Sequence, residues 1–140
     1  MRPFCGYNMG DYFAHWLDTG RRLARAPKIF RVNWFRRGGN GRFLWPGYGD
    51  NIRVLKWIVG RIHGQSDAQD TPIGHVPSPD ALDLAGMDIA RAQVEAALRV
   101  ERDEWIESLA DLGEFYKQFG TRLPAALPTE LARTARRLTT

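Results

Sequence analysis

The sequence predicts an α+β fold, with an early β-hairpin followed by α-helices, in a chain of 140 residues. β-forming residues concentrate between Ile29 and Trp45, around an Asn-Gly pair that favours a tight hairpin turn. Beyond Asn51, apolar residues recur at helical spacing in several segments. With 44% apolar residues and no internal repeat, the chain suits one domain or a part of one.

The first half should contain a helix, a hairpin and a second helix. Residues 12–19 form the first helix, capped by Asp11, ended by Gly20 and buried because it is aromatic on most sides. Residues 29–35 and 43–45 form the two strands, and Pro46 ends the second. Asp50 or Asn51 caps the next helix, which Gly64 ends. The apolar face of that helix holds Val54, Leu55, Ile58, Val59 and Ile62.

The second half should be helical after a loop. Residues 65–87 are interpreted as a loop because they contain Pro72, Pro77 and Pro79. Helical patterns follow over residues 88–100, where Asp88 is the cap, over 102–119, which Gly120 ends, and over 127–138.

Charge and aromatic content divide the chain at Gly64. Residues 1–64 carry a net charge of +9 and 12 aromatic residues, whereas residues 65–140 carry −5 and 4. We therefore treat 1–64 and 65–140 as two portions of one domain. A basic, aromatic-rich portion suits an anionic ligand that contains rings, although early core residues surrounded by arginines would give the same composition.

Several classes of protein are disfavoured. No apolar run approaches a membrane span and no secretory leader is evident, so a cytoplasmic protein is expected. A single cysteine, Cys5, excludes an internal disulfide framework. The three histidines lack the spacing of a metal site, and the glycines of residues 38–41 lack the Lys and Thr of a phosphate loop. No catalytic or metal-binding residue is predicted.

One constellation remains, over residues 32–51. Phe35, Phe43 and Tyr48 lie close in sequence, and Asn51 follows at a predicted helix start. Two aromatic planes can hold a purine between them, and an amide can distinguish guanine from adenine because it offers an acceptor and donors to the base edge. The alternative is structural: Phe35 and Phe43 pack in the core and Asn51 only caps the helix.

Long aromatic-rich strings carry a more specific signal. They include Met1-Arg2-Pro3-Phe4 with Gly6-Tyr7-Asn8, then Val32-Asn33-Trp34-Phe35-Arg36, and above all Gly41-Arg42-Phe43-Leu44-Trp45-Pro46-Gly47-Tyr48-Gly49-Asp50-Asn51. These strings resemble the GTP-dependent phosphoenolpyruvate carboxykinase family, closely up to about residue 84 and more loosely beyond it. The resemblance implies part of an α/β P-loop-type kinase domain.

The resemblance also implies a reaction and a nucleotide site. The family converts oxaloacetate and GTP to phosphoenolpyruvate, GDP and CO2 in gluconeogenesis, with Mn2+ at the catalytic centre and Mg2+ on the nucleotide. Carried over, Phe35 and Tyr48 sandwich the guanine, Phe43 contacts its edge and Asn51 reads it. Tyr48 departs from the usual phenylalanine, which should preserve stacking but adds a hydroxyl that needs a partner.

The resemblance covers only the C-terminal portion of the family's polypeptide. The family's phosphate loop, metal ligands, reactive cysteine, oxaloacetate-binding arginines and lid lie outside it, and Cys5 does not match the reactive position. We therefore expect a fragment that is inactive and poorly soluble alone, from a monomeric enzyme without membrane partners. Two other functions stay open: a single-stranded nucleic-acid-binding module that uses the basic, aromatic hairpin, and an interaction fragment whose acidic helices dock a partner.

Overall fold

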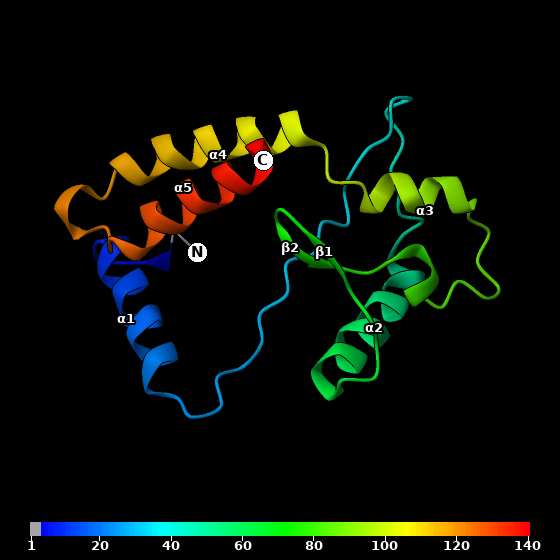
Figure 1. The fold of residues 1–140 in the computed structure, drawn as a ribbon, viewed down its shortest axis with the longest axis horizontal. Coiled ribbons are helices and arrows are strands. Elements are labelled where there is room, and N and C mark those ends of the chain that lie inside the picture. The colour runs from blue at the N-terminus through cyan, green and yellow to red at the C-terminus, as the bar shows by residue number, and fades with distance from the viewer. Residues whose placement is uncertain (1–3) are drawn as a thin grey trace. The chain divides into compact units, whose positions relative to one another are not determined.

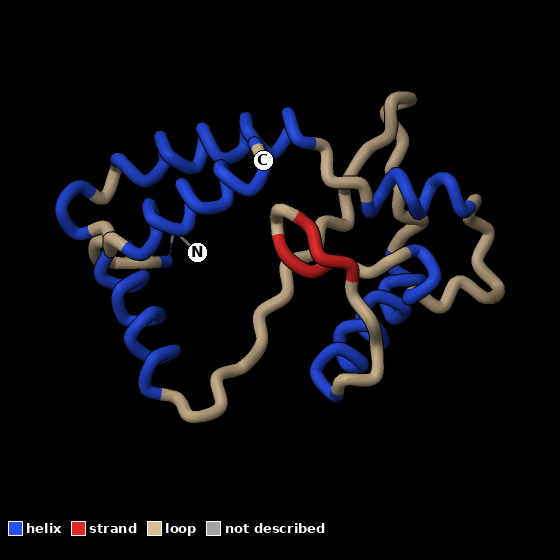
Figure 2. The backbone as a smooth tube through the Cα atoms, in the orientation of Figure 1, coloured by secondary structure: helices blue, strands red, loops and turns tan. Residues whose placement is uncertain are grey.

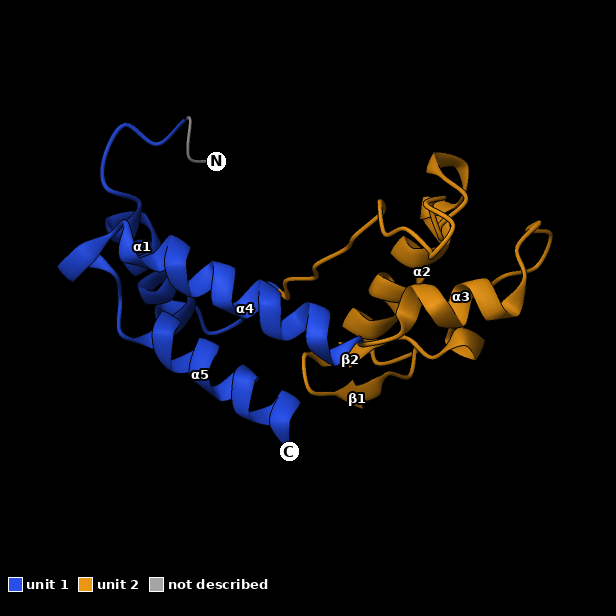
Figure 3. Cartoon of the chain, turned by 90° about the horizontal axis from the view of Figure 1, so that it is seen from above, with its two compact units in different colours: residues 1–27, 101–140 blue, residues 28–100 orange. Residues whose placement is uncertain are grey.

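The computed structural model describes residues 4–140. The first three residues of the N-terminal Met-Arg-Pro-Phe string lie outside the described residues. The chain forms two compact units, shown in different colours in Figure 3. Unit 1 comprises residues 1–27 and 101–140, and unit 2 comprises residues 28–100. All four predicted site residues belong to unit 2.

Unit 1 consists of helices, in agreement with the sequence. α1 spans Met9–Arg22, α4 spans Arg102–Lys117 and α5 spans Ala126–Thr139 (Figure 1). α1 begins earlier than predicted because Asn8, not Asp11, caps it and accepts a hydrogen bond from the Gly10 amide at 2.8 Å. The helix also continues through Gly20, and Gly10 is its only buried residue, so the prediction of a buried helix was wrong.

An aromatic cluster joins α1 to the segment between α4 and α5. Phe119 lies 5.4 Å from Phe13 and 5.1 Å from Phe115 between ring centroids, both in edge-to-face geometry. Arg122, in the short 3-10 helix Gly120–Arg122, pairs with Asp11 at 2.7 Å. Gly120 turns the chain there with φ of 54°, which fits the prediction that it ends the preceding helix.

Replacing Gly10 by alanine should destabilise unit 1. A Cβ atom at position 10 would lie 2.5 Å from the backbone carbonyl oxygen of Arg122. Because this neighbour is backbone and not the end of a flexible side chain, it cannot easily move away. Overpacking of this kind costs about 1–3 kcal/mol. Chemical denaturation of the Gly10→Ala variant should report that loss, whereas Gly20→Ala, which adds a methyl group into open space on the same helix, should be neutral or stabilising. Equal stability of the two variants would contradict the packing described here.

Unit 2 has its core around α2, which spans Asn51–His63. Trp57 is buried against Leu82 and Val94, and its indole N–H donates to the Asp67 carbonyl at 2.9 Å. Gly64 ends α2 in the left-handed conformation, as predicted. Part of the predicted apolar face is instead exposed, because Trp57 turns the opposite side of the helix to the core. The exposed stripe holds Ile52, Leu55, Val59 and Ile62.

A small hairpin and a short helix complete unit 2. β1, Gln69–Thr71, pairs antiparallel with β2, Gly74–Val76 (Figure 2). The interpretation of residues 65–87 as loop missed this hairpin, whose two-residue turn places Pro72 at the second position and Gly74 at the fourth, a standard turn pattern. α3 spans Arg91–Leu98 and starts later than the predicted cap at Asp88.

The predicted hairpin of residues 29–45 is present only at its tip. Residues 29–35 form no strand, and one antiparallel bridge joins Arg37 to Phe43. The predicted partner segment is short and ends at Pro46, which has no N–H to donate. Residues 29–35 therefore have no strand opposite them and follow an extended loop. Within residues 4–140, no helix combines the length and apolar character that crossing a bilayer requires.

Candidate functional site

The tip of the hairpin is tightly turned. The Gly38 amide donates to the Arg42 carbonyl at 2.9 Å, and the Gly41 amide donates to the Gly38 carbonyl at 2.9 Å. Gly41 has φ of 74°, a conformation that suits the Asn-Gly signal in the sequence. The Leu44 amide donates to the Arg36 carbonyl at 2.8 Å and closes the base of the tip. These bonds bring together two segments that each carry an aromatic candidate.

Phe35 and Phe43 form a contacting pair across the hairpin. Their ring centroids are 5.9 Å apart with an interplanar angle of 64°, an edge-to-face arrangement. Phe35 is 72% exposed and Phe43 is 46% exposed, so the pair lies on the surface and not in the core of unit 2. The guanidinium carbon of Arg37 lies 4.3 Å from the Phe43 ring centroid and covers one face of that ring.

Tyr48 stands apart from this pair. It opens a short 3-10 turn, Tyr48–Asp50, that leads directly into α2. Gly47 before it adopts φ of 140°, which favours glycine, and follows the rigid Pro46. The Tyr48 side chain is 92% exposed and makes no ring contact within residues 4–140. The structure therefore joins Phe35 to Phe43 but does not join Tyr48 to either.

Asn51 makes a defined side-chain contact at the start of α2. The indole N–H of Trp45 donates to the Asn51 Oδ1 atom at 2.9 Å. Because an indole nitrogen can only donate, this bond fixes which end of the amide faces Trp45. Neither Asn51 nor Asp50 caps α2 through its side chain, since Asp50 instead accepts from the Arg53 Nε atom at 3.1 Å. Asp50 does stand at the predicted N-cap position of α2, but its side chain bonds Arg53 and not the backbone of the first turn.

Trp45 connects Asn51 to the aromatic pair. It follows Phe43 by two residues, is 9% exposed and lies 6.3 Å from Trp34, the residue before Phe35. The two tryptophans thus hold together the backbone segments that carry Phe35 and Phe43. Both tryptophans lie close to the candidate rings in the sequence, but no sequence pattern indicated the hydrogen bond from Trp45 to Asn51.

Two basic residues early in α2, Arg53 and Lys56, bond to the loop that follows the small β-hairpin. Arg53 also donates from Nη1 to the Asp83 carbonyl at 2.6 Å, and Lys56 pairs with the Asp83 carboxylate at 2.7 Å. The hydrogen bond from Lys56, and then one from the Ala85 amide, lowers the pKa of Asp83 below its ordinary value. These contacts fix the first turn of α2 to the loop that follows the small β-hairpin.

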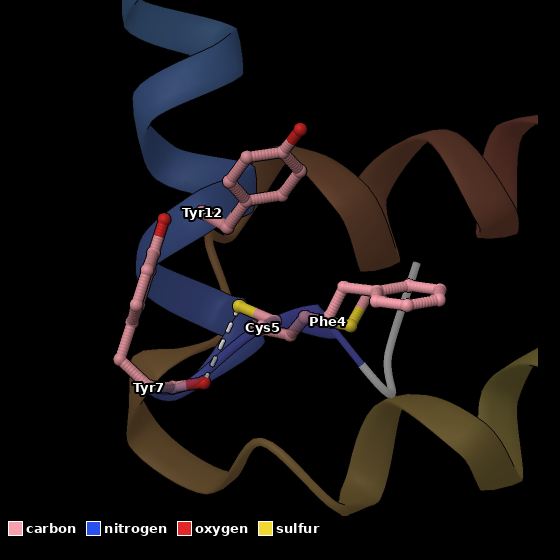
Figure 4. Close-up of a pocket in the computed structure, with 5 residues that line it drawn as sticks. Phe4, Cys5, Tyr7 and Tyr12 are labelled. Atoms are coloured by element: carbon pink, nitrogen blue, oxygen red, sulfur yellow. Dashed lines mark hydrogen bonds between the residues drawn. The ribbon is translucent and has the colours of Figure 1, made fainter.

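A separate hollow of about 130 Å³ lies at the N-terminal end of α1 (Figure 4). Phe4, Cys5, Tyr7, Met9 and Tyr12 line it. The Cys5 thiol donates to the Tyr7 carbonyl at 3.4 Å, which Figure 4 marks by a dashed line. Pockets for drug-sized ligands enclose about 300–1,000 Å³, so this hollow is too small for a nucleotide.

The described residues do not fit a metal centre. Nowhere in residues 4–140 do three His, Cys, Asp or Glu side chains come together as ligands. The Mn2+ and Mg2+ that the family resemblance implies therefore have no ligand set among residues 4–140.

Comparison with known proteins agrees with the resemblance. The family model for the phosphoenolpyruvate carboxykinase C-terminal P-loop domain matches residues 1–137. The phosphoenolpyruvate carboxykinase [GTP] of Arthrobacter sp. (strain FB24) is 53% identical over 133 residues, covering 94% of this chain and 22% of the relative. The protein of the same name from Neocallimastix frontalis is 49% identical over 141 residues, covering 99% and 23%.

A third relative, from Anaeromyxobacter dehalogenans (strain 2CP-C), has the same name and is 46% identical over 127 residues, which cover 91% of this chain and 21% of the relative. The chain thus spans less than a quarter of the length of these curated relatives. Because the family model covers nearly the whole sequence, the chain belongs to the GTP-dependent phosphoenolpyruvate carboxykinase family and corresponds to part of its C-terminal P-loop domain.

Proposed function

We propose that unit 2 binds the guanine base of GTP or GDP for a phosphoenolpyruvate carboxykinase. The observation that carries this proposal is the exposed Phe35–Phe43 pair, connected through Trp45 to an Asn51 amide of fixed orientation. The structural alternative would instead require the Phe35 and Phe43 rings to be buried in the core and Asn51 to do no more than cap α2. Exposed rings are available to a base, and each stacked base contributes about 1–3 kcal/mol.

The proposed base lies between the Phe35 and Tyr48 rings and meets Phe43 at its edge. Arg37 covers one face of Phe43, so a base reaches that ring from the edge or from the other face. Tyr48 is the freely exposed ring that would close over the second face of the base. The 65–140 portion, including the small hairpin and α3, would then support a nucleotide site carried by the 1–64 portion.

Asn51 would determine the specificity for guanine over adenine. Its oxygen accepts from Trp45, so its amide nitrogen is directed away from the indole, and nothing in residues 4–140 accepts from that nitrogen. An amide N–H suits the oxygen at position six of guanine, an acceptor, and mismatches the amino group of adenine, a donor. A buried donor that faces another donor costs about 1–3 kcal/mol, which favours guanine about ten- to a hundredfold.

The whole reaction would need residues beyond this chain. We propose that the complete enzyme is a cytoplasmic, monomeric lyase that converts oxaloacetate and GTP to phosphoenolpyruvate, GDP and CO2 in gluconeogenesis, with Mn2+ and Mg2+ bound elsewhere. The chain alone would bind nucleotide without turnover. A GTP-dependent oxaloacetate decarboxylation assay of the 140 residues should show no activity, and measurable turnover would overturn this part of the proposal.

Tryptophan fluorescence offers a direct test of nucleotide binding. Trp45 touches Asn51 and contacts Trp34, so their emission should change when a base occupies the site. GDP should produce a saturable change at a concentration at least about tenfold lower than ADP. Equal affinity for GDP and ADP would exclude the role proposed for Asn51, and no response to either would exclude the nucleotide site.

The same experiment separates the nucleic-acid alternative. A single-stranded oligothymidylate should compete with GDP only weakly at physiological salt. Tight oligonucleotide binding that falls steeply with salt, without preference for free GDP, would instead favour a single-stranded nucleic-acid-binding module built on the arginines of the hairpin.

Replacing Asn51 by alanine should erase the preference for guanine. GDP affinity is expected to fall about ten- to a hundredfold while ADP affinity changes little, because only guanine loses a hydrogen bond. Competition titrations of the Asn51→Ala variant with both nucleotides would measure the ratio. A preserved ratio of GDP to ADP affinity would contradict the assignment.

An isosteric variant controls for the lost contact with Trp45. Asn51→Asp keeps an oxygen for the indole N–H but replaces the amide nitrogen by a second acceptor. It should therefore shift the preference toward ADP, whose amino group can donate to that oxygen. If Asn51→Asp kept the unmodified preference for GDP while Asn51→Ala lost it, the effect would come from the Trp45 contact and not from reading of the base.

A further inference from the structure

The hairpin is attached to α3 through the residues that follow the two aromatic rings in the sequence. Arg36 follows Phe35 and Leu44 follows Phe43, and these two residues are themselves joined by the Leu44 amide and the Arg36 carbonyl at 2.8 Å. Each therefore fixes the backbone position directly next to one candidate ring. Both residues also make a second, separate hydrogen bond that leaves the hairpin.

Both of these bonds reach α3. The Arg36 guanidinium donates from Nη1 to the carbonyls of Ala97, at 3.1 Å, and Arg99. Gln93 donates from Nε2 to the Leu44 carbonyl at 2.6 Å. Gln93 and Ala97 are four residues apart and so lie on one face of the helix, one turn apart. The hairpin is thus held at two points along α3.

The chemistry of the first attachment suits the end of a helix. The last carbonyls of an α-helix have no partner within the helix, and the C-terminal end carries partial negative charge. A guanidinium that donates to these carbonyls satisfies them and places its positive charge favourably. The Arg36 guanidinium is consequently engaged by the C-terminal end of α3.

α3 is itself firmly fixed in unit 2. Val94, next to Gln93, is 1% exposed and packs with Trp57 and Leu82 in the core. The helix can therefore transmit the rigidity of the core to the hairpin.

We propose that Arg36 and Gln93 are positioning residues for purine binding. By bonding the hairpin to α3, they hold the backbone next to Phe35 and Phe43 so that the two rings keep the arrangement that receives the base, and they do not touch the nucleotide themselves. This inference rests on the proposed function. It makes α3, about sixty residues further along the chain, a part of the nucleotide site.

A double-mutant cycle in the 140-residue chain tests the role. Arg36→Gln and Gln93→Met, which removes the N–H donor with little change of shape, should each weaken GDP binding about three- to tenfold. In a Phe35→Ala background Arg36→Gln should have little further effect, and in a Phe43→Ala background the same should hold for Gln93→Met, because each change acts through the ring that is gone. Gln93→Lys, which restores a donor, should recover part of the affinity.

Arg91→Gln is the matched control. Arg91 also lies on α3, but it pairs with Asp80 at 2.6 Å and with Glu95 at 3.0 Å and not with the hairpin. This variant should lower the thermal midpoint as the other variants do and leave GDP affinity unchanged. Circular dichroism establishes that each variant is folded before titration.

The outcomes separate the two proposals. If Phe35→Ala weakens GDP binding while folded Arg36→Gln and Gln93→Met bind like the unmodified chain, the positioning role is wrong and the nucleotide site stands. If Arg91→Gln weakens binding as much as they do, the effect is general destabilisation and the positioning role is also wrong. If Phe35→Ala itself changes nothing, the nucleotide site fails and the positioning role fails with it.

Discussion

Replacing Phe35 by alanine is expected to weaken GDP binding about tenfold to a hundredfold, which corresponds to the 1–3 kcal/mol of one stacked base. Phe35 is the more exposed member of the pair and would present a full face to the purine, whereas Arg37 already covers one face of Phe43. Adenine stacks on the same ring, so ADP affinity should fall by a similar factor. Fluorescence titration or calorimetry would measure both.

Two comparisons make this result specific. Phe4→Ala removes a similarly exposed phenylalanine, at 90% exposure, from unit 1 and should leave nucleotide affinity unchanged. Tyr48→Phe should bind GDP as the unmodified chain does, because the ring and not the hydroxyl stacks. Loss of affinity in Phe4→Ala, or unaltered affinity in Phe35→Ala, would contradict the placement of the base.

Replacing Trp57 by alanine should have the largest effect on stability, a loss of about 3–5 kcal/mol in the free energy of unfolding. The side chain is buried against Leu82 and Val94, lies 6.1 Å from Phe30 in edge-to-face geometry and donates to the Asp67 carbonyl. Its removal would leave a cavity and an unpaired carbonyl together. Small domains are stable by about 5–15 kcal/mol in total. A urea titration should therefore show that unit 2 is already partly unfolded at zero urea.

The same helix provides the control. Ile52→Ala truncates an apolar side chain of α2 that is 64% exposed, and it should change stability by less than about 0.5 kcal/mol. Because α3 packs on Trp57 through Val94, GDP binding should also be lost in Trp57→Ala. A stably folded Trp57→Ala variant that still bound GDP would show that the core does not support the site.

The helices were predictable because their signals are local. The 3.6-residue spacing of apolar positions and the glycines at 64 and 120 located α2, α4 and α5 within a few residues. The start of α1 was misplaced because Asn8, three residues before the predicted cap Asp11, caps the helix instead. Its actual start depends on Gly10, whose missing side chain lets the backbone of Arg122 approach, a contact between distant parts of the sequence.

The strands were less predictable because a strand depends on its partner. Residues 29–35 are rich in β-forming residues, yet the segment that would pair with them is too short because it ends at Pro46. Gln69–Thr71 and Gly74–Val76 have weak composition, yet the Pro72 turn brings them into register. Amino-acid composition therefore gave the wrong secondary structure for both segments. For residues 69–76, only the turn pattern at residues 71–74 could have indicated the hairpin.

The candidate site was identified from the sequence as a set of residues but not as an arrangement. Phe35 and Phe43 were expected near each other because a hairpin tip joins them. The bond between Trp45 and Asn51 and the attachment of Arg36 to α3 depend on tertiary structure that no local pattern encodes. Whether Tyr48 and Phe35 enclose a base remains a prediction that the titrations above decide.

The isolated position of Tyr48 has a consequence for how a base would enter. Phe35 already rests against Phe43, so its ring loses little freedom on binding, whereas the Tyr48 ring, hinged after Gly47, must be immobilised at a cost of about 0.5–1.5 kcal/mol. The two walls of the slot would consequently contribute unequally to affinity. Tyr48 would act mainly on the residence time of the nucleotide, by closing after arrival and slowing departure.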